Sequence, residues 1–343
     1  MGRHPLLYAS VGIEPLRQSF AIAPLKEKPF ESLMRLGGYD AKNDGALSDV
    51  FDYAMDHGTT FFDTAEVYGF GRSEELLGKF AARHPQSDKV QVATKFAALP
   101  WRTKPKDVLE AAKKSTDRLG RPIDLYQIHF PNAWANEEYM EGLGQCVDSG
   151  LVKAAGVSNY GVDAMRKCSE KLGAYGVPLT SNQIQLSLLY PFALNNGLKR
   201  TCDELGVQVL AYSPLGLGIL TGKFSETNLP SGPRKALAEK YLADPAFGEL
   251  ISTMREIGRT NHGGATCAQM ALAWCTAKGA CVIPGARTVA QAASNVAAAE
   301  LRLSAEDVAR LDKAAAAVQP QTTPETVPFP KKDIRTGLVM FDS

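Results

Sequence analysis

The stretch that decides the fold prediction is residues 61–69, which read FFDTAEVYG. It begins with two phenylalanines, as the end of a buried strand does, and then places Asp63 and Tyr68 five residues apart on a short turn. An isolated pair of this kind is better explained as an ordinary turn. Its significance depends on two strand ends further along the chain.

Two later apolar segments also end in a polar side chain. Residues 90–95 end in Lys95, and residues 125–129 end in His129. Each segment has the apolar run of a buried strand. If these strands are neighbours in a parallel barrel, we expect Asp63, Tyr68, Lys95 and His129 to meet at one rim.

Strand-like and helix-like segments alternate throughout the chain after residue 58. Strands are predicted at 59–62, 90–95, 124–129, 152–157, 179–183, 207–212 and 280–283. This alternation indicates a parallel sheet with helical crossovers, and an eighth strand must come from the N-terminal region. We therefore predict an α/β fold of the (β/α)8 TIM-barrel type. A doubly wound open sheet is the alternative, although no G-x-G-x-x-G opens a helix after the first strand.

The helices expected between these strands include one at 194–205 and a last one at 304–317, where Ser304 and Asp307 have the spacing of a capping box. A long loop is expected from residue 214 to about residue 235. We predict one barrel domain over residues 1–343, with a divergent N-terminal segment at 1–45 and a C-terminal tail at 319–343.

Composition excludes several classes of protein. The 343 residues are enough for a large core, and 45% apolar with 22% charged residues is typical of a soluble globular protein. The 38 basic and 37 acidic residues balance, so we expect neither a nucleic-acid nor a membrane partner. The N-terminus does not resemble a secretory signal. A cytoplasmic location is expected, with the chloroplast or another organelle as the alternative.

The six cysteines are scattered and form no C-x-x-C pair. This pattern predicts free thiols in a reducing compartment and no bound metal.

The four rim residues suggest proton transfer to a carbonyl. A tyrosine titrates near 10, and a neighbouring lysine cation is expected to lower that pKa. Asp63 would keep Lys95 charged, and His129 would donate a hydrogen bond to a substrate oxygen. Taken singly, these residues could be a buried ion pair, a core histidine and a packing tyrosine. Together, at consecutive strand ends, they favour a general acid above a polarised carbonyl.

None of these groups can supply a hydride, so the reaction needs a cofactor. Later strand ends offer amides and hydroxyls for a carboxamide and an aromatic face for its ring, at Ser158, Asn159, Gln183 and Tyr212. The small-residue loop 213–218 could meet a pyrophosphate, and Arg287 before a helix could meet a phosphate. An ordinary turn and a solvated charge are the alternatives for the last two.

The motifs at these positions resemble the aldo-keto reductase family. The resemblance extends from about residue 45 to residue 317 and is carried by DTAEVYG at 63–69, ATKF at 93–96, DLYQIH at 124–129, GVSNY at 156–160, NQ at 182–183, AYSPL at 211–215 and IPGA at 283–286. Residues 93–102 and 210–223 are similar to the plant and cyanobacterial branch, which includes chloroplast-targeted reductases.

The resemblance implies a barrel that binds NADPH, with Tyr68 as proton donor, Lys95 and Asp63 as its tuning pair and His129 as carbonyl orienter. The implied cofactor residues are Ser158, Asn159 and Gln183 at the carboxamide, Tyr212 stacked on the nicotinamide, Ser213, Leu215 and Gly216 along the pyrophosphate, and Arg287, Gln291 and Asn295 near the adenosine 2′-phosphate. The Arg287 guanidinium is the reason to expect NADPH rather than NADH. Trp101 and Trp134 are expected to wall the substrate pocket, with plain loop packing as the alternative.

The N-terminal segment departs from the family pattern. A strand followed by a Gly-rich, often Trp-containing segment is usual, whereas this chain offers only residues 20–23 and the turn at 37–40.

The predicted function is NADPH-dependent reduction of aldehydes, with ketones as a further class, acting on a small-molecule carbonyl substrate. An NADPH-binding regulatory or sensor subunit is the alternative, since potassium-channel beta subunits resemble this family. A barrel that binds no cofactor is a third possibility. Oligomeric state is not predicted.

Overall fold

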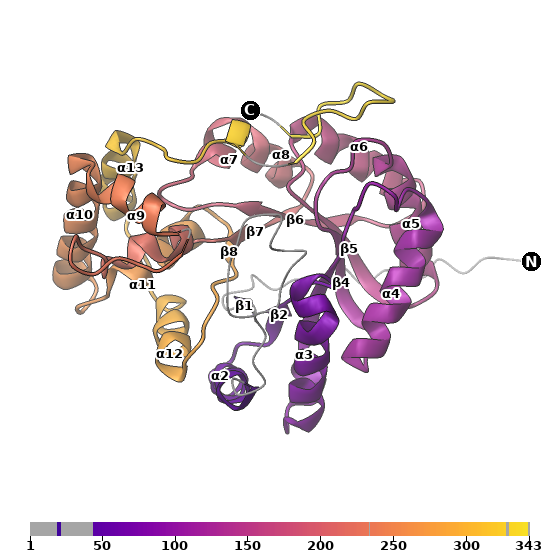
Figure 1. Ribbon diagram of the computed structural model, residues 1–343, viewed down its shortest axis with the longest axis horizontal. Coiled ribbons are helices and arrows are strands. Elements are labelled where there is room, and N and C mark those ends of the chain that lie inside the picture. Colours follow the sequence, from indigo (N-terminus) through magenta and orange to yellow (C-terminus); the bar gives the residue numbers. More distant parts are fainter. Residues whose placement is uncertain (1–18, 22–43, 233, 327–328, 342–343) are drawn as a thin grey trace, which may run out of the picture.

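The structure of the protein is a computed structural model, and it describes residues 19–21, 44–232, 234–326 and 329–341. Eight strands form one sheet in chain order (Figure 1). They are β1 (Ser19–Ala21), β2 (Phe61–Asp63), β3 (Gln91–Phe96), β4 (Ile123–Ile128), β5 (Val152–Ser158), β6 (Leu179–Gln185), β7 (Gln208–Tyr212) and β8 (Cys281–Val282). Every neighbouring pair is parallel. Because β1 also contacts β8, the sheet curls back on itself as a (β/α)8 barrel rather than a doubly wound open sheet.

The eighth strand does come from the N-terminal region. β1 pairs with β2 so that Ser19 lies opposite Phe61 and Ala21 opposite Asp63. The described part of this strand is Ser19–Ala21, and the rest of the predicted 20–23 strand lies outside the described residues, as does the turn expected at 37–40.

Helices follow the strands and form the outer layer of the barrel (Figure 1). They are α2 (Asp44–Asp56), α3 (Arg72–Arg83), α4 (Pro105–Leu119), α5 (Asn136–Asp148), α6 (Val162–Gly173), α7 (Phe192–Asn195), α8 (Leu198–Glu204), α9 (Arg234–Leu242), α10 (Pro245–Asn261), α11 (Cys267–Ala277), α12 (Val289–Ala298) and α13 (Ala305–Ala317). Within the described part of the chain, no helix is both long and apolar enough to cross a bilayer.

The strands present two different faces. Their outer face packs against the helices, for example where the Phe62 and Phe51 rings lie 4.6 Å apart. Their inner face forms a separate apolar cluster that includes Phe61, Ala93 and Leu125. Side chains alternate along a strand, so the residues two positions further on also point into the barrel. This places polar side chains above an apolar plug at the carboxyl ends of β2, β3 and β4.

One predicted helix is two helices. Residues 194–205 divide at Gly197, whose φ of 89° is left-handed and breaks the helical path between α7 and α8. The Asn196 side chain then accepts a hydrogen bond from the Leu198 amide at 3.0 Å. The predicted loop from residue 214 contains a short 3-10 helix, Gly216–Thr221, before α9 begins. The capping box is confirmed, because the Ser304 hydroxyl accepts from the Asp307 amide at 3.0 Å.

The described part of the C-terminal tail lies over the loops that follow β4 and β5 (yellow in Figure 1). Its buried Asp333 accepts a hydrogen bond from the Asn136 side chain at 2.8 Å. The Ile334 amide donates to the carbonyl of Ala133 at 2.7 Å, and Gly161 donates to that of Met340 at 2.8 Å. The tail is therefore docked on the strand-end side of the barrel.

Candidate active site

A buried ion pair lies at the centre of the rim. Asp63 ends β2 and Lys95 lies near the end of β3; their exposed fractions are 1% and 0%. The Lys95 ammonium donates to Asp63 Oδ1 and to the Thr64 carbonyl, the latter at 2.7 Å. Burial, the largest single influence, lowers the pKa of Lys95, but Asp63 and Tyr68 together raise it by more, so the net pKa is raised. Lys95 is therefore a cation at neutral pH.

Tyr68 lies on the turn after β2 and faces the other rim residues. Lys95 Nζ is 5.1 Å from the centre of its ring, and the His129 ring meets it edge to face at 5.7 Å. The pKa of Tyr68 is raised, because burial outweighs the lowering effect of Lys95 and Asp63 raises it further. The expectation that the pKa is lowered is thus wrong in its net direction. The phenol stays protonated at neutral pH, as a proton donor must.

His129 directly follows β4, where its amide donates to the Phe96 carbonyl at 2.9 Å. Burial and the Lys95 cation lower the pKa of its imidazole to about 3. The ring is therefore neutral. Its Nδ1 is buried and has no hydrogen-bond partner among the described residues. A buried polar atom without a partner is rare in folded proteins and is a candidate to meet a ligand.

Gln127 belongs to this cluster and was not predicted as a site residue. Its side chain donates to Asp63 Oδ2 at 3.3 Å, and Gln183 donates to the same oxygen at 2.8 Å. Both carboxylate oxygens of Asp63 are thus satisfied by buried side chains. The signal in the sequence was an amide two residues before His129, on the same face of an otherwise apolar strand.

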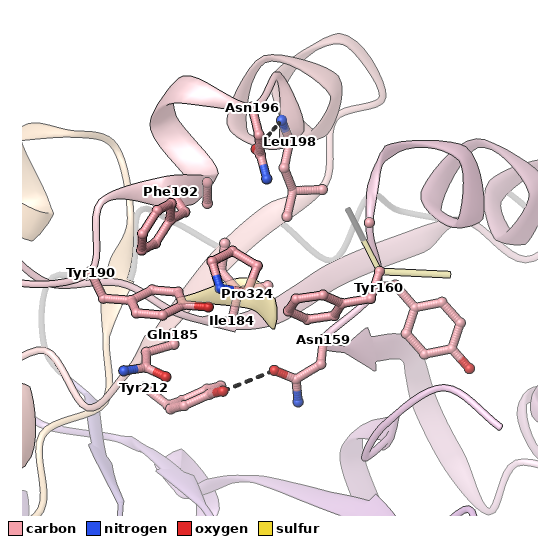
Figure 2. Close-up of a pocket in the computed structure, with 13 residues that line it drawn as sticks. Asn159, Tyr160, Ile184, Gln185, Tyr190, Phe192, Asn196, Leu198, Tyr212 and Pro324 are labelled. Carbon is pink, nitrogen blue, oxygen red and sulfur yellow. Dashed lines mark hydrogen bonds between the residues drawn. The ribbon is translucent and has the colours of Figure 1, made fainter. Parts of the chain in front are cut away.

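The residues expected at the carboxamide lie together beside this cluster. Asn159 has a left-handed φ of 63°. Its side-chain Nδ2 donates to the His129 carbonyl at 3.2 Å and to Ser158 Oγ at 3.1 Å. Ser158 donates to the Gln183 carbonyl at 2.8 Å. The Tyr212 hydroxyl donates to Asn159 Oδ1 at 2.9 Å (Figure 2). The structure therefore brings all four residues into one network, joined to Asp63 through Gln183.

Backbone strain is concentrated at the same rim. The non-glycine residues with positive φ in the described chain are Phe70, Asn159, Ser213 and Leu217, at 54°, 63°, 50° and 57°. All four lie in loops after the carboxyl ends of strands. Such conformations are unfavourable by about 1–3 kcal/mol and collect at functional sites. They mark this face of the barrel independently of any motif.

The loop after β7 has the backbone needed for a close ligand contact. Gly216 has a φ of 54° and donates to the Ser213 carbonyl at 2.9 Å, and an added Cβ there would lie 3.1 Å from Leu189. At Gly218, with a φ of 88°, an added Cβ would meet nothing within 4 Å. A left-handed backbone with open space beside it suits the approach of a pyrophosphate. Leu215 lies in the same loop, directly before Gly216.

The outer cofactor residues surround the N-terminus of α12. The Thr288 hydroxyl caps this ten-residue helix by accepting from the Gln291 amide, and Gln291 Oε1 accepts from the Arg287 amide at 2.8 Å. Arg287 is exposed, whereas Asn295 is buried and donates to a backbone carbonyl at 3.5 Å. A helix N-terminus beside an arginine favours a phosphate, so these residues fit the expected cofactor.

Trp101 and Trp134 are exposed by 68% and 41%. They lie in the loops after β3 and β4, at the same rim as the other site residues. A pocket of about 30 Å³ lies beside Tyr212 and Asn159 and includes Tyr190 in its lining (Figure 2). Neither tryptophan lines this pocket.

No group of three or more histidine, cysteine, aspartate or glutamate side chains is placed to hold a metal ion within the residues that the structure describes.

Comparison with known proteins agrees with this geometry. The model of the aldo/keto reductase family matches residues 33–316, so the chain belongs to this family of oxidoreductases. It is 39% identical to the chloroplastic pyridoxal reductase of Arabidopsis thaliana, over 82% of this chain and 79% of that one. The glycerol dehydrogenase of Gluconobacter oxydans matches with a TM-score of 0.73 at 26% identity, over 91% of this chain and 94% of that one. An aldo-keto reductase from Klebsiella pneumoniae, solved with NADPH, matches with a TM-score of 0.63 at 25% identity, over 88% and 90%.

Proposed function

We propose that this protein reduces aldehydes, and ketones as a further class, to alcohols with NADPH, using Tyr68 as the proton donor. One observation carries the proposal: a protonated Tyr68 faces both the buried Asp63–Lys95 pair and a neutral His129. This is the arrangement that proton donation to a carbonyl oxygen requires.

The residues of the rim have separate tasks in this reaction. NADPH, when bound, supplies the hydride to the carbonyl carbon. The neutral His129 donates a hydrogen bond to the carbonyl oxygen and stabilises its growing negative charge. Tyr68 gives its proton to that oxygen, and the Lys95 cation stabilises the phenolate that remains. Asp63 keeps Lys95 charged and in place.

The cofactor assignments rest on the network around Asn159 and on the capped N-terminus of α12. Ser158, Asn159 and Gln183 would hold the carboxamide, and Tyr212 would face the nicotinamide ring. Ser213, Leu215 and Gly216 would contact the pyrophosphate. Arg287, Gln291 and Asn295 would contact the 2′-phosphate. Family membership and the NADPH-bound Klebsiella pneumoniae structure support this cofactor.

Two exposed tryptophans, Trp101 and Trp134, complete the proposal as walls for the substrate. The plant relative is named a pyridoxal reductase, so pyridoxal is a sensible test substrate beside simple aromatic and aliphatic aldehydes. The regulatory alternative is less favoured, because the chain belongs to a family of reductases and the plant relative is itself named a reductase. The buried free cysteines of the described chain agree with a reducing compartment, and we propose that this compartment is the cytoplasm. Cell fractionation tests the proposal against the chloroplast, which is the location given in the plant relative's name.

Tyr68→Phe tests the mechanism. We expect turnover of aldehydes to fall by at least about 100-fold, because the proton donor is lost. NADPH binding, followed by quenching of the fluorescence of the three tryptophans, should stay within about twofold of wild type. Tyr175→Phe, which removes a hydroxyl far from the rim, is the matched control. Retained carbonyl reduction in Tyr68→Phe would show that the proposed mechanism is wrong.

A further inference from the structure

The turn that carries Tyr68 is tied to the end of β3 by an ion pair that the mechanism does not use. Glu66 Oε1 accepts a hydrogen bond from Arg102 Nη1 at 2.6 Å and another from the Ala97 amide, also at 2.6 Å. The side chains of Arg102 and Glu66 are exposed by only 19% and 14%. A largely buried pair with this geometry holds its position better than an exposed one, which is weak and screened by water.

Arg102 is itself held from three sides. Its Nη1 also donates to the Ala97 carbonyl at 3.1 Å, and its guanidinium lies 4.0 Å from the centre of the Phe96 ring. Its own carbonyl accepts from the Tyr139 hydroxyl of α5 at 2.5 Å. Arg102 thus joins α5, the segment just after Lys95 and the turn before Tyr68. These contacts hold helix α5 and the two rim segments in fixed positions relative to one another.

We propose that Glu66 and Arg102 are positioning residues that set where the Tyr68 hydroxyl lies relative to Lys95. Glu66 stands two residues before Tyr68, and Ala97 stands two residues after Lys95, so the contact links the segment that carries the proton donor to the segment that carries the cation beside it. The inference rests on the proposed function, since it needs Tyr68 to be the donor.

The turn has a specific need for such a tie. After Tyr68 the chain passes through two residues with left-handed φ, Gly69 at 59° and Phe70 at 54°, and the Phe70 side chain is 65% exposed. Packing therefore does not hold this part of the turn. The Thr64 hydroxyl fixes its base by donating to Ser73 at 2.7 Å, and Glu66 fixes the segment between. A strained turn of this kind persists only where its surroundings determine it.

The two charges cancel each other, so their effect on the rim is one of position rather than of field. A displacement of a reacting group by about 1 Å can lower a rate by roughly 100-fold. Losing one of several ties should move Tyr68 by less than that. We therefore expect a loss of roughly tenfold in the proton-transfer step.

Arg102→Met, Arg102→Lys and Glu66→Gln test this in the full-length protein with NADPH and an aldehyde substrate. The control is Lys153→Met, which breaks the 2.7 Å ion pair with Asp124. Both residues lie at the amino ends of their strands, β5 and β4, away from the rim. In Arg102→Met, kcat should fall by roughly tenfold while the Kd for NADPH stays within about twofold. The solvent deuterium isotope effect on kcat should rise, because proton transfer has become slower. Arg102→Lys, which keeps a cationic hydrogen-bond donor for Glu66, should recover most of kcat, and Glu66→Gln should give a smaller loss than Arg102→Met.

The outcomes separate this inference from the proposed function. If wild type turns over and Arg102→Met keeps both its kcat and its isotope effect, the inference is wrong and the reductase function stands. A kcat loss with an unchanged isotope effect and no rescue by Arg102→Lys would assign the pair a merely structural role, which also contradicts the inference. If wild type reduces no carbonyl at all, the proposed function fails and this inference fails with it. Should Arg102→Met not fold, Arg102→Lys and Glu66→Gln carry the same readouts.

Discussion

The rim of the barrel has two halves that solve the same burial problem with different chemistry. The strand ends of β2 and β3 bury opposite charges, Asp63 and Lys95, with at most 1% of either exposed. The strand ends of β5 and β7 carry neutral groups, among them the buried Asn159 and the half-buried Tyr212, which are joined by a hydrogen bond. A buried charge without its partner is far more costly than a neutral group that loses one hydrogen bond. The charged half should therefore fail abruptly when changed, and the neutral half by degrees.

Gln183 joins the two halves. Its side chain donates to Asp63 Oδ2 at 2.8 Å. Its backbone carbonyl accepts from the Ser158 hydroxyl at 2.8 Å and from the backbone N–H of Asn159 at 2.9 Å. A residue expected to contact the cofactor thus also satisfies the catalytic carboxylate. The two halves share a structural element, although their electrostatics differ.

The largest effect is expected in the charged half. Lys95→Met should lower turnover by more than about 1,000-fold, because it removes the cation that stabilises the Tyr68 phenolate. It should also destabilise the fold by roughly 3–5 kcal/mol, since Asp63 stays buried without its counter-charge. Turnover assays and urea unfolding measure the two effects.

The double variant Asp63→Asn/Lys95→Met provides the control. It removes both charges, so we expect it to regain most of the lost free energy of unfolding and none of the activity. A single Lys95→Met variant as stable as wild type would contradict the view of this half as a buried pair. An active double variant would contradict its role in proton transfer.

A smaller effect is expected at His129, which lies between the halves. Its folded-state pKa is about 3, well below its ordinary value of 6.5, because of burial and the Lys95 cation. Between these two values the unfolded chain binds more protons, so this group makes the fold less stable as pH falls from 6.5 toward 3. In His129→Asn the loss of unfolding free energy between about pH 7 and about pH 4.5 should be smaller than in wild type, by about 2 kcal/mol. Urea unfolding at both pH values measures it, and an equal pH dependence in the two proteins would show that the ring is not buried as a neutral group.

The fold could be predicted because its signals are local. Seven strands follow from apolar runs that alternate with helical segments, and parallel topology then places their carboxyl ends at one rim. The eighth strand could be assigned to the N-terminal region, but its short apolar run did not give its bounds; the described residues show Ser19–Ala21 paired with β2. The division of the 194–205 helix at Gly197 was missed because a single glycine inside a helical pattern is often tolerated.

The site was predicted less completely than the fold. The strand ends locate Asp63, Lys95 and His129, because residues at the carboxyl ends of parallel barrel strands lie at the same rim. Gln127 was missed since a buried amide inside a strand resembles a chance polar residue until its partner is known. The net direction of the Tyr68 pKa depends on the depth of burial, which the sequence does not record, and so the effect of Lys95 was overestimated.

The smallest effect is expected in the neutral half, at Tyr212. Tyr212→Phe keeps the aromatic face but removes the hydroxyl that donates to Asn159 Oδ1 at 2.9 Å. A hydrogen bond of this kind contributes about 1 kcal/mol, which corresponds to a loss of roughly fivefold in NADPH affinity. The titration by tryptophan fluorescence measures it, and kcat at saturating NADPH should change by less than about twofold.

The neighbouring Tyr190 offers a matched control in the same pocket (Figure 2). Its hydroxyl is buried and has no hydrogen-bond partner among the described residues, and the side chain is only 5% exposed. Tyr190→Phe therefore removes the same atom from the same pocket without breaking a bond to Asn159. We expect its NADPH affinity to equal that of wild type. Equal losses in both variants would mean that the pocket's hydroxyls act together rather than through Asn159, whereas an abrupt loss of turnover in Tyr212→Phe would remove the distinction between the two halves of the rim.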